Sequence, residues 1–251
     1  MDLFSYIYFP NFEDDIKKLA SLANTEPWKF SPDNSPDYEI LKNYIKYFFK
    51  RVYEKNAFET IQGSSREHQC FNTGLLTNNL EEIYATYKQN NNSSSTPWIF
   101  IDFCKESDHQ MSKFSTLPDM VTFMETLEQL YFDTEKPFRL NTSHIITDNR
   151  ERFKEPYKSF DDGLLTTIIN GAMIKTYKLV KRNYKIAVPQ YYNAKFQFLM
   201  PLYFSNMSEP DLIITIEDKG DYYYGFTHLT KEMAYKNARI IAKPETDWLN
   251  V

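Results

Sequence analysis

Hydrophobic side chains return at helical spacing in four stretches of the chain. Apolar positions recur every three or four residues over residues 12–24, 38–53, 116–131 and 161–182. Pro118 suits the first turn of the third stretch, and Asp161 with Asp162 can accept hydrogen bonds from the free N–H groups that begin the fourth. We therefore predict four helices, each with one buried face.

The last third of the chain shows strand-like patterns instead. Strands are expected in AVPQYY (187–192), FQFLMPLYF (196–204), residues 212–216 and residues 222–226. The last two flank EDKGD, where Gly220 can take the positive φ of a tight hairpin turn. Thr230 then caps a final helix, which Pro244 ends. This order predicts an antiparallel hairpin followed directly by a helix.

The first half also contains expected strands, at residues 58–63, 70–75 and 98–104. The turn GSSRE joins the first two, and NNNSSST before the third is expected to be a surface loop. Between the strands expected at 70–75 and 98–104, Asn78 or Asn79 is expected to cap a short helix. Glu81 and Glu82 would lie in its first turn, where negative charge interacts favourably with the helix dipole.

Helices and antiparallel strands come in separate runs, which predicts an α+β fold rather than repeated βαβ units. We expect a single mixed domain over residues 37–251, built on a central, largely antiparallel sheet that helices flank. An N-terminal helix and a Pro-rich connector would occupy residues 1–36. No internal repeat is visible in the sequence.

Composition narrows the function classes. The six glycines form neither GxGxxG nor GxxxxGK[ST], which excludes these dinucleotide-binding and P-loop fingerprints. The net charge of −5 provides no overall attraction to nucleic acid. Basic residues nevertheless recur on one face of the helix predicted at 161–182 and just beyond it: Lys175, Lys178, Lys181, Arg182 and Lys185. This face is either solvated or a track for phosphates.

The aromatic content of 17% is high, and it suits either an aromatic core or a base-stacking surface. The N-terminal segment has no basic stretch before its short apolar run, so it does not resemble a signal peptide. No uncharged apolar run approaches the ~18 residues that span a bilayer. We expect a cytoplasmic protein with no membrane partner.

The histidines at 68, 109, 144 and 228 are scattered, and HExxH, HxxxH and CxxC patterns are absent. Cys70 and Cys104 lie far apart in the sequence, which argues against a disulfide framework. The sequence therefore predicts no metal site and no cofactor.

The most suggestive polar cluster is HIITDNRERF, residues 144–153. It brings His144, Arg150 and Arg152 within ten residues. Arginine forks bind phosphate, and histidine can act as an acid near neutral pH, which suits phosphodiester or nucleotide chemistry. The alternative is a solvated loop whose histidine bonds nearby carbonyls.

Two further segments offer binding groups. A turn at the end of one predicted strand can present N–H groups to an anion, or it is a plain turn; it contains Asn72, Thr73 and Gly74. In the final helix, Arg239 follows Asn237 closely. Arg239 is either a ligand clamp or an internal anchor to Glu245 or Asp247.

Five blocks carry a family resemblance: FNTGL (71–75), HIITDNRERF (144–153), AVPQYY (187–192), FQFLMPLYF (196–204) and LTKEMAYKNARIIAKPETDWL (229–249). In this order they resemble the mainly bacterial domain-of-unknown-function family 3825, over about residues 19–250. The resemblance implies a role in RNA metabolism, because such domains are often joined to LOTUS-type (OST-HTH) RNA-binding domains. It assigns no catalytic residues.

Three functions are open at this point. The first is an RNA- or nucleotide-interacting domain, which would include a metal-independent RNA-processing enzyme. The second is a non-catalytic protein-interaction module, in which Asn237, Arg239 and Trp248 are buried and bonded internally. The third is an enzyme that acts on a small nucleotide signal. The sequence leaves the oligomeric state open.

The first hypothesis requires that separate blocks converge in one cleft. The expected catalytic residues are His144, Arg150 and Arg239. The expected binding residues are Asn72, Thr73, Gly74, Gln190, Tyr192 and Asn237. In this site Tyr192 would stack on a base, the arginines would hold phosphate, and His144 would be the acid or base.

Overall fold

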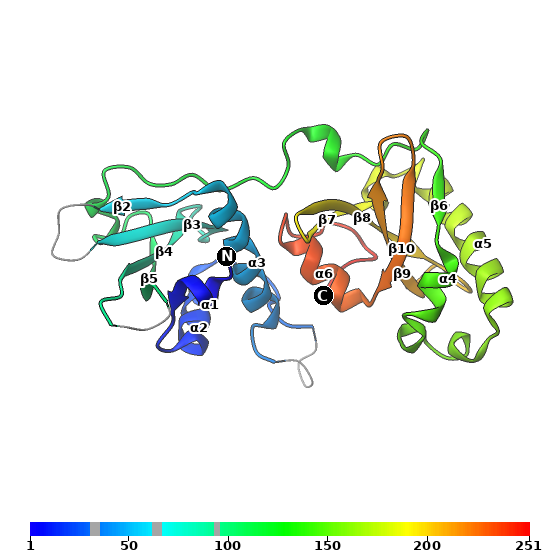
Figure 1. The fold of residues 1–251 in the computed structure, drawn as a ribbon, viewed down its shortest axis with the longest axis horizontal. Coiled ribbons are helices and arrows are strands. Elements are labelled where there is room, and N and C mark those ends of the chain that lie inside the picture. Colours follow the sequence, from blue (N-terminus) through cyan, green and yellow to red (C-terminus); the bar gives the residue numbers. More distant parts are fainter. Residues whose placement is uncertain (31–35, 62–66, 93–95) are drawn as a thin grey trace. The chain divides into compact units, whose positions relative to one another are not determined.

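The chain forms two compact units in a computed structural model that describes residues 1–30, 36–61, 67–92 and 96–251. The first unit comprises Met1–Thr122 with Val251, and the second comprises Phe123–Asn250. Both are drawn in Figure 1. The boundary expected near residue 36 falls within the first unit.

The first unit combines three α-helices with a five-stranded sheet. Its helices are α1 (Leu3–Tyr6), α2 (Phe12–Leu22) and α3 (Glu39–Lys55). Its strands are β1 (Ile7–Tyr8), β2 (Glu59–Ile61), β3 (His68–Leu76), β4 (Glu82–Gln89) and β5 (Trp98–Lys105). The strand order is β1-β5-β4-β3-β2, with β1 parallel to β5 and the other neighbours antiparallel.

The two faces of this sheet carry different layers. On one face Phe71 packs against Phe49 of α3, with ring centroids 5.4 Å apart. Side chains alternate along a strand, so Cys70 points to the other face. There it clusters with Tyr84, Cys104 and Met111, the last from the 3-10 helix η1 (Met111–Lys113). The helical layer therefore covers one face, and a short irregular segment covers part of the other.

The second unit also carries one five-stranded sheet. Its α-helices are α4 (Thr142–Thr147), α5 (Asp162–Val180) and α6 (Lys231–Arg239). Its strands are β6 (Phe138–Leu140), β7 (Val188–Tyr192), β8 (Lys195–Leu202), β9 (Leu212–Asp218) and β10 (Tyr223–Leu229). Short 3-10 helices are η2 (Leu127–Leu130), η3 (Arg150–Arg152), η4 (Tyr157–Ser159) and η5 (Tyr184–Ile186).

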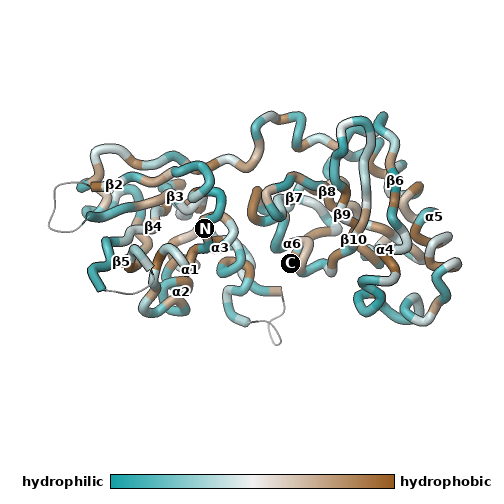
Figure 2. The backbone as a smooth tube through the Cα atoms, in the orientation of Figure 1, coloured by the Kyte–Doolittle hydropathy of each residue, from teal (hydrophilic) through white to brown (hydrophobic). Residues whose placement is uncertain are grey.

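The second sheet has the order β6-β10-β9-β8-β7, with β6 parallel to β10 and the rest antiparallel. Asp161 caps the start of α5, and its side chain accepts a hydrogen bond from Leu164 N at 2.9 Å. The helix buries Ile169 and Met173 against the apolar face of the sheet, which Met200 and Ile214 help to form. Figure 2 shows hydrophobic stretches in α5 and in the strands β8 and β9, to which Met200 and Ile214 belong.

The two sheets share one topology. In each unit a short first strand is followed by helices, then by four strands that pair with their neighbours in turn, and the first strand lies parallel to the last. The order β1-β5-β4-β3-β2 thus corresponds to β6-β10-β9-β8-β7. The structure contains a topological repeat that the sequence does not reveal.

The predicted α+β class is confirmed, but the chain builds two sheets where we expected one central sheet. The strand patterns identify strands without identifying their partners, and the irregular segment from residue 106 to 137 separates the two groups. The helices near residues 12–24, 38–53 and 161–182 and the final helix are confirmed.

Two predicted helices are absent from the described residues. The segment 116–131 is irregular apart from η2, and its Leu127 is 76% exposed although the helical pattern would bury it. The helix expected after Asn78 is replaced by a turn and β4, in which Tyr84, Ala85 and Tyr87 are all buried. A strand that is covered on both faces lacks polar alternation, so its sequence did not identify it. The predicted GSSRE turn lies outside the described residues except for Glu67, and the predicted NNNSSST loop is described only at residues 90–92 and 96.

A methyl group at Gly225 tests the packing between β6 and β10. A Cβ at this position would lie 2.6 Å from Leu140 Cδ2 and 3.0 Å from Ile216 Cδ1. We expect Gly225→Ala to lower the unfolding free energy of the second unit by about 1–3 kcal/mol through overpacking. Gly171→Ala in α5 is the control, because outside the helix's own backbone and the neighbouring residues no described atom lies within 4 Å of the new Cβ. It should stabilise α5 by up to ~1 kcal/mol. Urea unfolding measures the change in unfolding free energy of both variants. Equal changes would contradict the close packing of Gly225 against Leu140 and Ile216.

Candidate functional site

The FNTG segment of β3 is part of the fold's internal bonding. Asn72 Nδ2 donates to Glu82 Oε2 at 2.9 Å and to Pro118 O at 3.3 Å. Gly74 N donates to Asn72 Oδ1 at 2.9 Å, and Thr73 Oγ1 donates to Ile83 O at 2.7 Å. Because Gly74 N–H already has a partner, this segment does not present it to an anion.

Gly74 itself is required by backbone conformation and space. Its φ is +71°, which residues with a side chain rarely adopt. A Cβ would lie 2.6 Å from Phe48 Cζ and 2.7 Å from the Tyr44 hydroxyl oxygen. The glycine of the FNTG segment is therefore explained by the close packing of β3 on α3.

Arg150 acts as a brace between η3, η4 and α5. Its Nε donates to Lys158 O at 3.1 Å, and its Nη1 lies 2.6 Å from Asp162 Oδ1. The remaining terminal nitrogen donates to Phe160 O. All three nitrogens of the guanidinium thus bind protein oxygens, so Arg150 is already occupied as a structural group.

His144 lies on α4 and is partly exposed. Its Nδ1 is 2.7 Å from Asp148 Oδ2, one helical turn away. α4 packs beside α5, because Ile145 and Ile146 belong to the same buried cluster as Leu165 and Ile169. His144 and Arg150 are therefore both on the side of the second sheet that carries α4 and α5.

A chain of three amides, of which Gln190 and Gln197 are buried and Asn237 is partly buried, lies on the opposite face of that sheet. Gln190 is 1% exposed, and its Nε2 donates to Gln197 Oε1 at 2.8 Å. Asn237 Nδ2 of α6 donates to Gln190 Oε1 at 3.0 Å. Gln197 precedes Phe198, which faces α5, so strand alternation directs the amides toward α6.

The predicted residues consequently divide into three groups. Asn72, Thr73 and Gly74 belong to the first unit. Within the second unit, α4 and η3 hold His144 and Arg150 on one side of the sheet, whereas α6 holds Asn237 and Arg239 on the other. Tyr192 ends β7 and is 44% exposed. The structure brings Gln190 together with Asn237, but it does not bring His144 together with Arg239.

A pocket of the second unit lies beside α6. It has a volume of about 590 Å³ and forms between the start of β7 and the segment that follows α6. Its apolar lining comprises Met124, Leu130, Ala187, Val188, Pro189, Ala238, Ile241, Ala242 and Pro244. Polar side chains reach it from Tyr184, Lys185, Lys243, Glu245 and Thr246.

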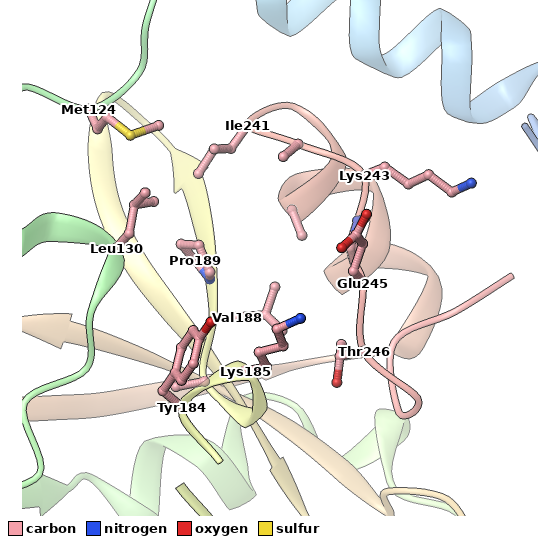
Figure 3. Close-up of a pocket in the computed structure, with 14 residues that line it drawn as sticks. Met124, Leu130, Tyr184, Lys185, Val188, Pro189, Ile241, Lys243, Glu245 and Thr246 are labelled. Atoms are coloured by element: carbon pink, nitrogen blue, oxygen red, sulfur yellow. The ribbon is translucent and has the colours of Figure 1, made fainter. Parts of the chain in front are cut away.

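Figure 3 shows how these side chains lie. Tyr184 and Lys185 stand beside Val188, and Glu245 approaches from the segment after α6. The amine of Lys243 extends away from the others. Trp248 Nε1 donates to Ile186 O at 3.1 Å, which fastens the C-terminal segment to η5, the element that carries Tyr184 and Lys185. The pocket walls are thus connected by a hydrogen bond.

Sequence reasoning missed most of this pocket. It identified Lys185 as one of several basic positions and named Glu245 only as a partner for Arg239. Tyr184 stands in a polar stretch without a motif, and the apolar residues look like ordinary core positions. Across the described residues, no group of three or more His, Cys, Asp or Glu side chains is arranged to hold a metal ion. Likewise, none of the described helices has both the length and the apolar character needed to cross a membrane.

His228 of β10 is a buried titratable group. Its ring centroid lies 4.8 Å from that of Phe153, and among the described residues neither of its ring nitrogens has a hydrogen-bond partner. Burial, the larger cause, and the cation of nearby Arg152 together lower the pKa of His228 to about 4, while the backbone of Ile145 acts in the opposite sense. The imidazole is therefore neutral at pH 7 and fills space in the core.

Replacement of Arg150 tests its bracing role. Lysine keeps the charge of Arg150 but cannot reproduce a planar fork on three oxygens. We expect Arg150→Lys to lower the unfolding free energy of the second unit by about 2 kcal/mol, measured by urea unfolding. The control is Arg139→Lys, at an exposed arginine that lies over the Tyr222 ring at 4.2 Å. A similar loss in both variants would contradict the bracing role.

The low pKa of His228 makes stability depend on pH. The folded protein binds a proton only near pH 4, whereas the unfolded chain binds it near pH 6.5, so stability falls as the pH drops from about 6.5 to 4. Over this window His228 should account for roughly 3 kcal/mol of the loss. His228→Leu should remove that part of the slope in urea unfolding between pH 4 and 7.5. Phe153→Leu, which alters the same packing without titrating, should retain it.

The sequence comparison accounts for nearly the whole chain. A family model described as "Domain of unknown function (DUF3825)" matches residues 19–248. Searches of curated proteins and of solved structures found no match. The matched residues include both sheets apart from β1, together with all but the last residue of the five sequence blocks. The chain belongs to the DUF3825 family of domains of unknown function.

Proposed function

We propose that the second unit binds a nucleotide, either free or as one residue of an RNA strand, in the pocket beside α6. The observation that carries this proposal is the combination of an apolar cavity of about 590 Å³ with an aromatic ring and a lysine at one wall. Cavities with mainly apolar walls and a few polar groups are typical ligand sites.

The apolar walls suit a base. Val188 and Pro189 line the pocket from β7, and Met124 and Leu130 line another part of it. Tyr184 is 62% exposed, although an aromatic side chain of this size is usually covered by the fold. A base that stacked on its ring would bury it.

The charged groups suit the rest of a nucleotide. Lys185 can hold a phosphate, and the Glu245 carboxylate can accept hydrogen bonds from ribose hydroxyls or from an amino group of a base. Outside the pocket, exposed Lys178, Lys181 and Arg182 at the end of α5 extend the positive charge. Lys181 has only an exposed partner, Glu135 at 3.3 Å, and such pairs are weak.

The proposal is one of binding, without catalysis. His144 and Arg150 belong to the other side of the sheet, and Arg150 is bonded to three protein oxygens. Asn237 and the buried Gln190 bind each other. These observations favour structural roles for Arg150, Gln190 and Asn237, which the sequence offered as catalytic or binding residues.

Binding is tested by fluorescence anisotropy with labelled single-stranded RNA and, in parallel, by calorimetry with the four nucleoside monophosphates. We expect Tyr184→Ala and Lys185→Gln each to weaken binding roughly tenfold, through lost stacking and a lost charge-assisted hydrogen bond. RNA affinity should also fall as salt rises. RNA binding without monophosphate binding would identify the strand as the ligand, and monophosphate binding alone would identify the free nucleotide.

Tyr192→Ala and Lys154→Gln are matched controls, because both residues are exposed in the same unit and neither lines the pocket. They should bind as the wild type does. A loss in Tyr192→Ala but not in Tyr184→Ala would move the site to the end of β7 and contradict the pocket. No binding of either ligand by the wild type at low salt would leave the protein-interaction module as the better explanation.

A further inference from the structure

A second pocket, of about 240 Å³, lies in the first unit. It is lined by Ile61, His68, Thr86, Lys88, Ile101, Gln110, Lys113 and Phe114. His68 of β3 and Lys88 of β4 stand directly opposite each other, and Thr86 follows on the same face two residues away. Gln69, Phe71 and Tyr87 point to the face that α3 covers, so this pocket lies on the face away from α3.

The segment that carries Gln110 and η1, which lines the pocket opposite the strands, is attached to the sheet by buried contacts. Cys104 Sγ donates to Gln110 Oε1 at 3.0 Å, and Met111 next to it is buried in the cluster with Cys70 and Tyr84. The side-chain oxygen of Gln110 thus already accepts a hydrogen bond from Cys104. Its NH₂ group has no partner in the described part of the chain and can donate to a ligand. Thr86 Oγ1 donates to Asp102 O at 3.0 Å, so the hydroxyl contributes to the floor and is not a free donor.

The pocket concentrates uncompensated positive charge. Neither Lys88 nor Lys113 forms an ion pair within residues 1–30, 36–61, 67–92 and 96–251, and no acidic side chain is among the lining residues. The two lysines come from opposite walls, Lys88 from β4 and Lys113 from η1. Two ammonium groups that share a concavity repel each other unless an anion lies between them. In a chain of net charge −5 this local excess is notable.

We propose that this pocket binds the phosphate group of a small phosphomonoester. A dianionic phosphate neutralises both ammonium groups and accepts a further hydrogen bond from Gln110, whereas a monocarboxylate would leave one positive charge uncompensated. Ile61, Ile101 and Phe114 provide apolar surface for the organic part of the molecule. The volume limits that part to a short body.

The repeat of topology places the two pockets on equivalent faces. In the first unit the pocket opens on the sheet face opposite α3, and in the second unit the nucleotide pocket adjoins α6 on the face opposite α5. Each unit thus uses the face that its central helices leave uncovered. The phosphate site does not depend on the nucleotide site, because the two pockets share no residue.

The test is an NMR titration of the full chain with inorganic phosphate and, separately, ethyl phosphate, in chloride buffers of constant ionic strength. We expect saturable shifts of amides around Lys88 and Gln110. Lys88→Gln and Lys113→Gln should each raise the dissociation constant about tenfold. Lys113 is exposed, so its variant tests the site even where Lys88→Gln impairs folding. Thermal unfolding in chloride alone checks that each variant is folded.

Lys17→Gln is the charge-matched control, at an exposed lysine of α2 that does not line the pocket. Its affinity for phosphate should equal that of the wild type. Shifts that grow linearly without saturation, or equal weakening in Lys17→Gln and Lys113→Gln, would overturn the proposal. Loss of the phosphate response in Lys185→Gln alone would also overturn it, because phosphate would then bind in the second unit. Failure of nucleotide binding leaves these readouts unaffected.

Discussion

The amide chain from Gln197 through Gln190 to Asn237 determines where the final helix lies on the second sheet. Buried amides are costly to leave unpaired, so α6 is held at the one position in which Asn237 reaches Gln190. The segment after α6 starts from that fixed point and is fastened again where Trp248 bonds Ile186. Between these two attachments it forms one wall of the larger pocket. The pocket is therefore a product of interior bonding, and the polar residues that are most specific in sequence build the frame rather than the lining.

Sequence patterns predicted those elements that carry both a clear period and a terminal signal. α5 has its apolar face and Asp161 as its cap, and the hairpin of β9 and β10 has its turn at Gly220. β4 lacks such signals because both of its faces are covered. In the segment 116–131 tertiary contacts prevail over helical spacing, since Val121 and Phe123 are buried two residues apart, as in extended chain.

The candidate site was less predictable for a physical reason. Pattern analysis finds unusual polar residues such as Arg150, but it cannot tell a side chain that binds a ligand from one that binds the protein's own carbonyls. A pocket lined by Val188, Ala238 and Ile241 uses the same residue types as a core. Likewise, the topological repeat leaves no trace in sequence, because a sheet face requires apolar side chains of suitable size and not particular residues. Aromatic residues such as Phe49 and Phe71 fill the first unit, whereas Ile169 and Ile214 serve in the second.

The parallel pairing of the first and last strands has a consequence for synthesis on the ribosome. In the first unit Ile7 pairs with Trp98, and in the second Phe138 pairs with Tyr223. β1 and β6 are the first strands of their sheets to be synthesised. Each can pair with its neighbour, β5 or β10, only after that last strand of the sheet has been made. Contacts of such long sequence separation slow folding and leave strand edges exposed in the meantime. The division into two units limits this delay, because β5 completes the first sheet before any strand of the second emerges.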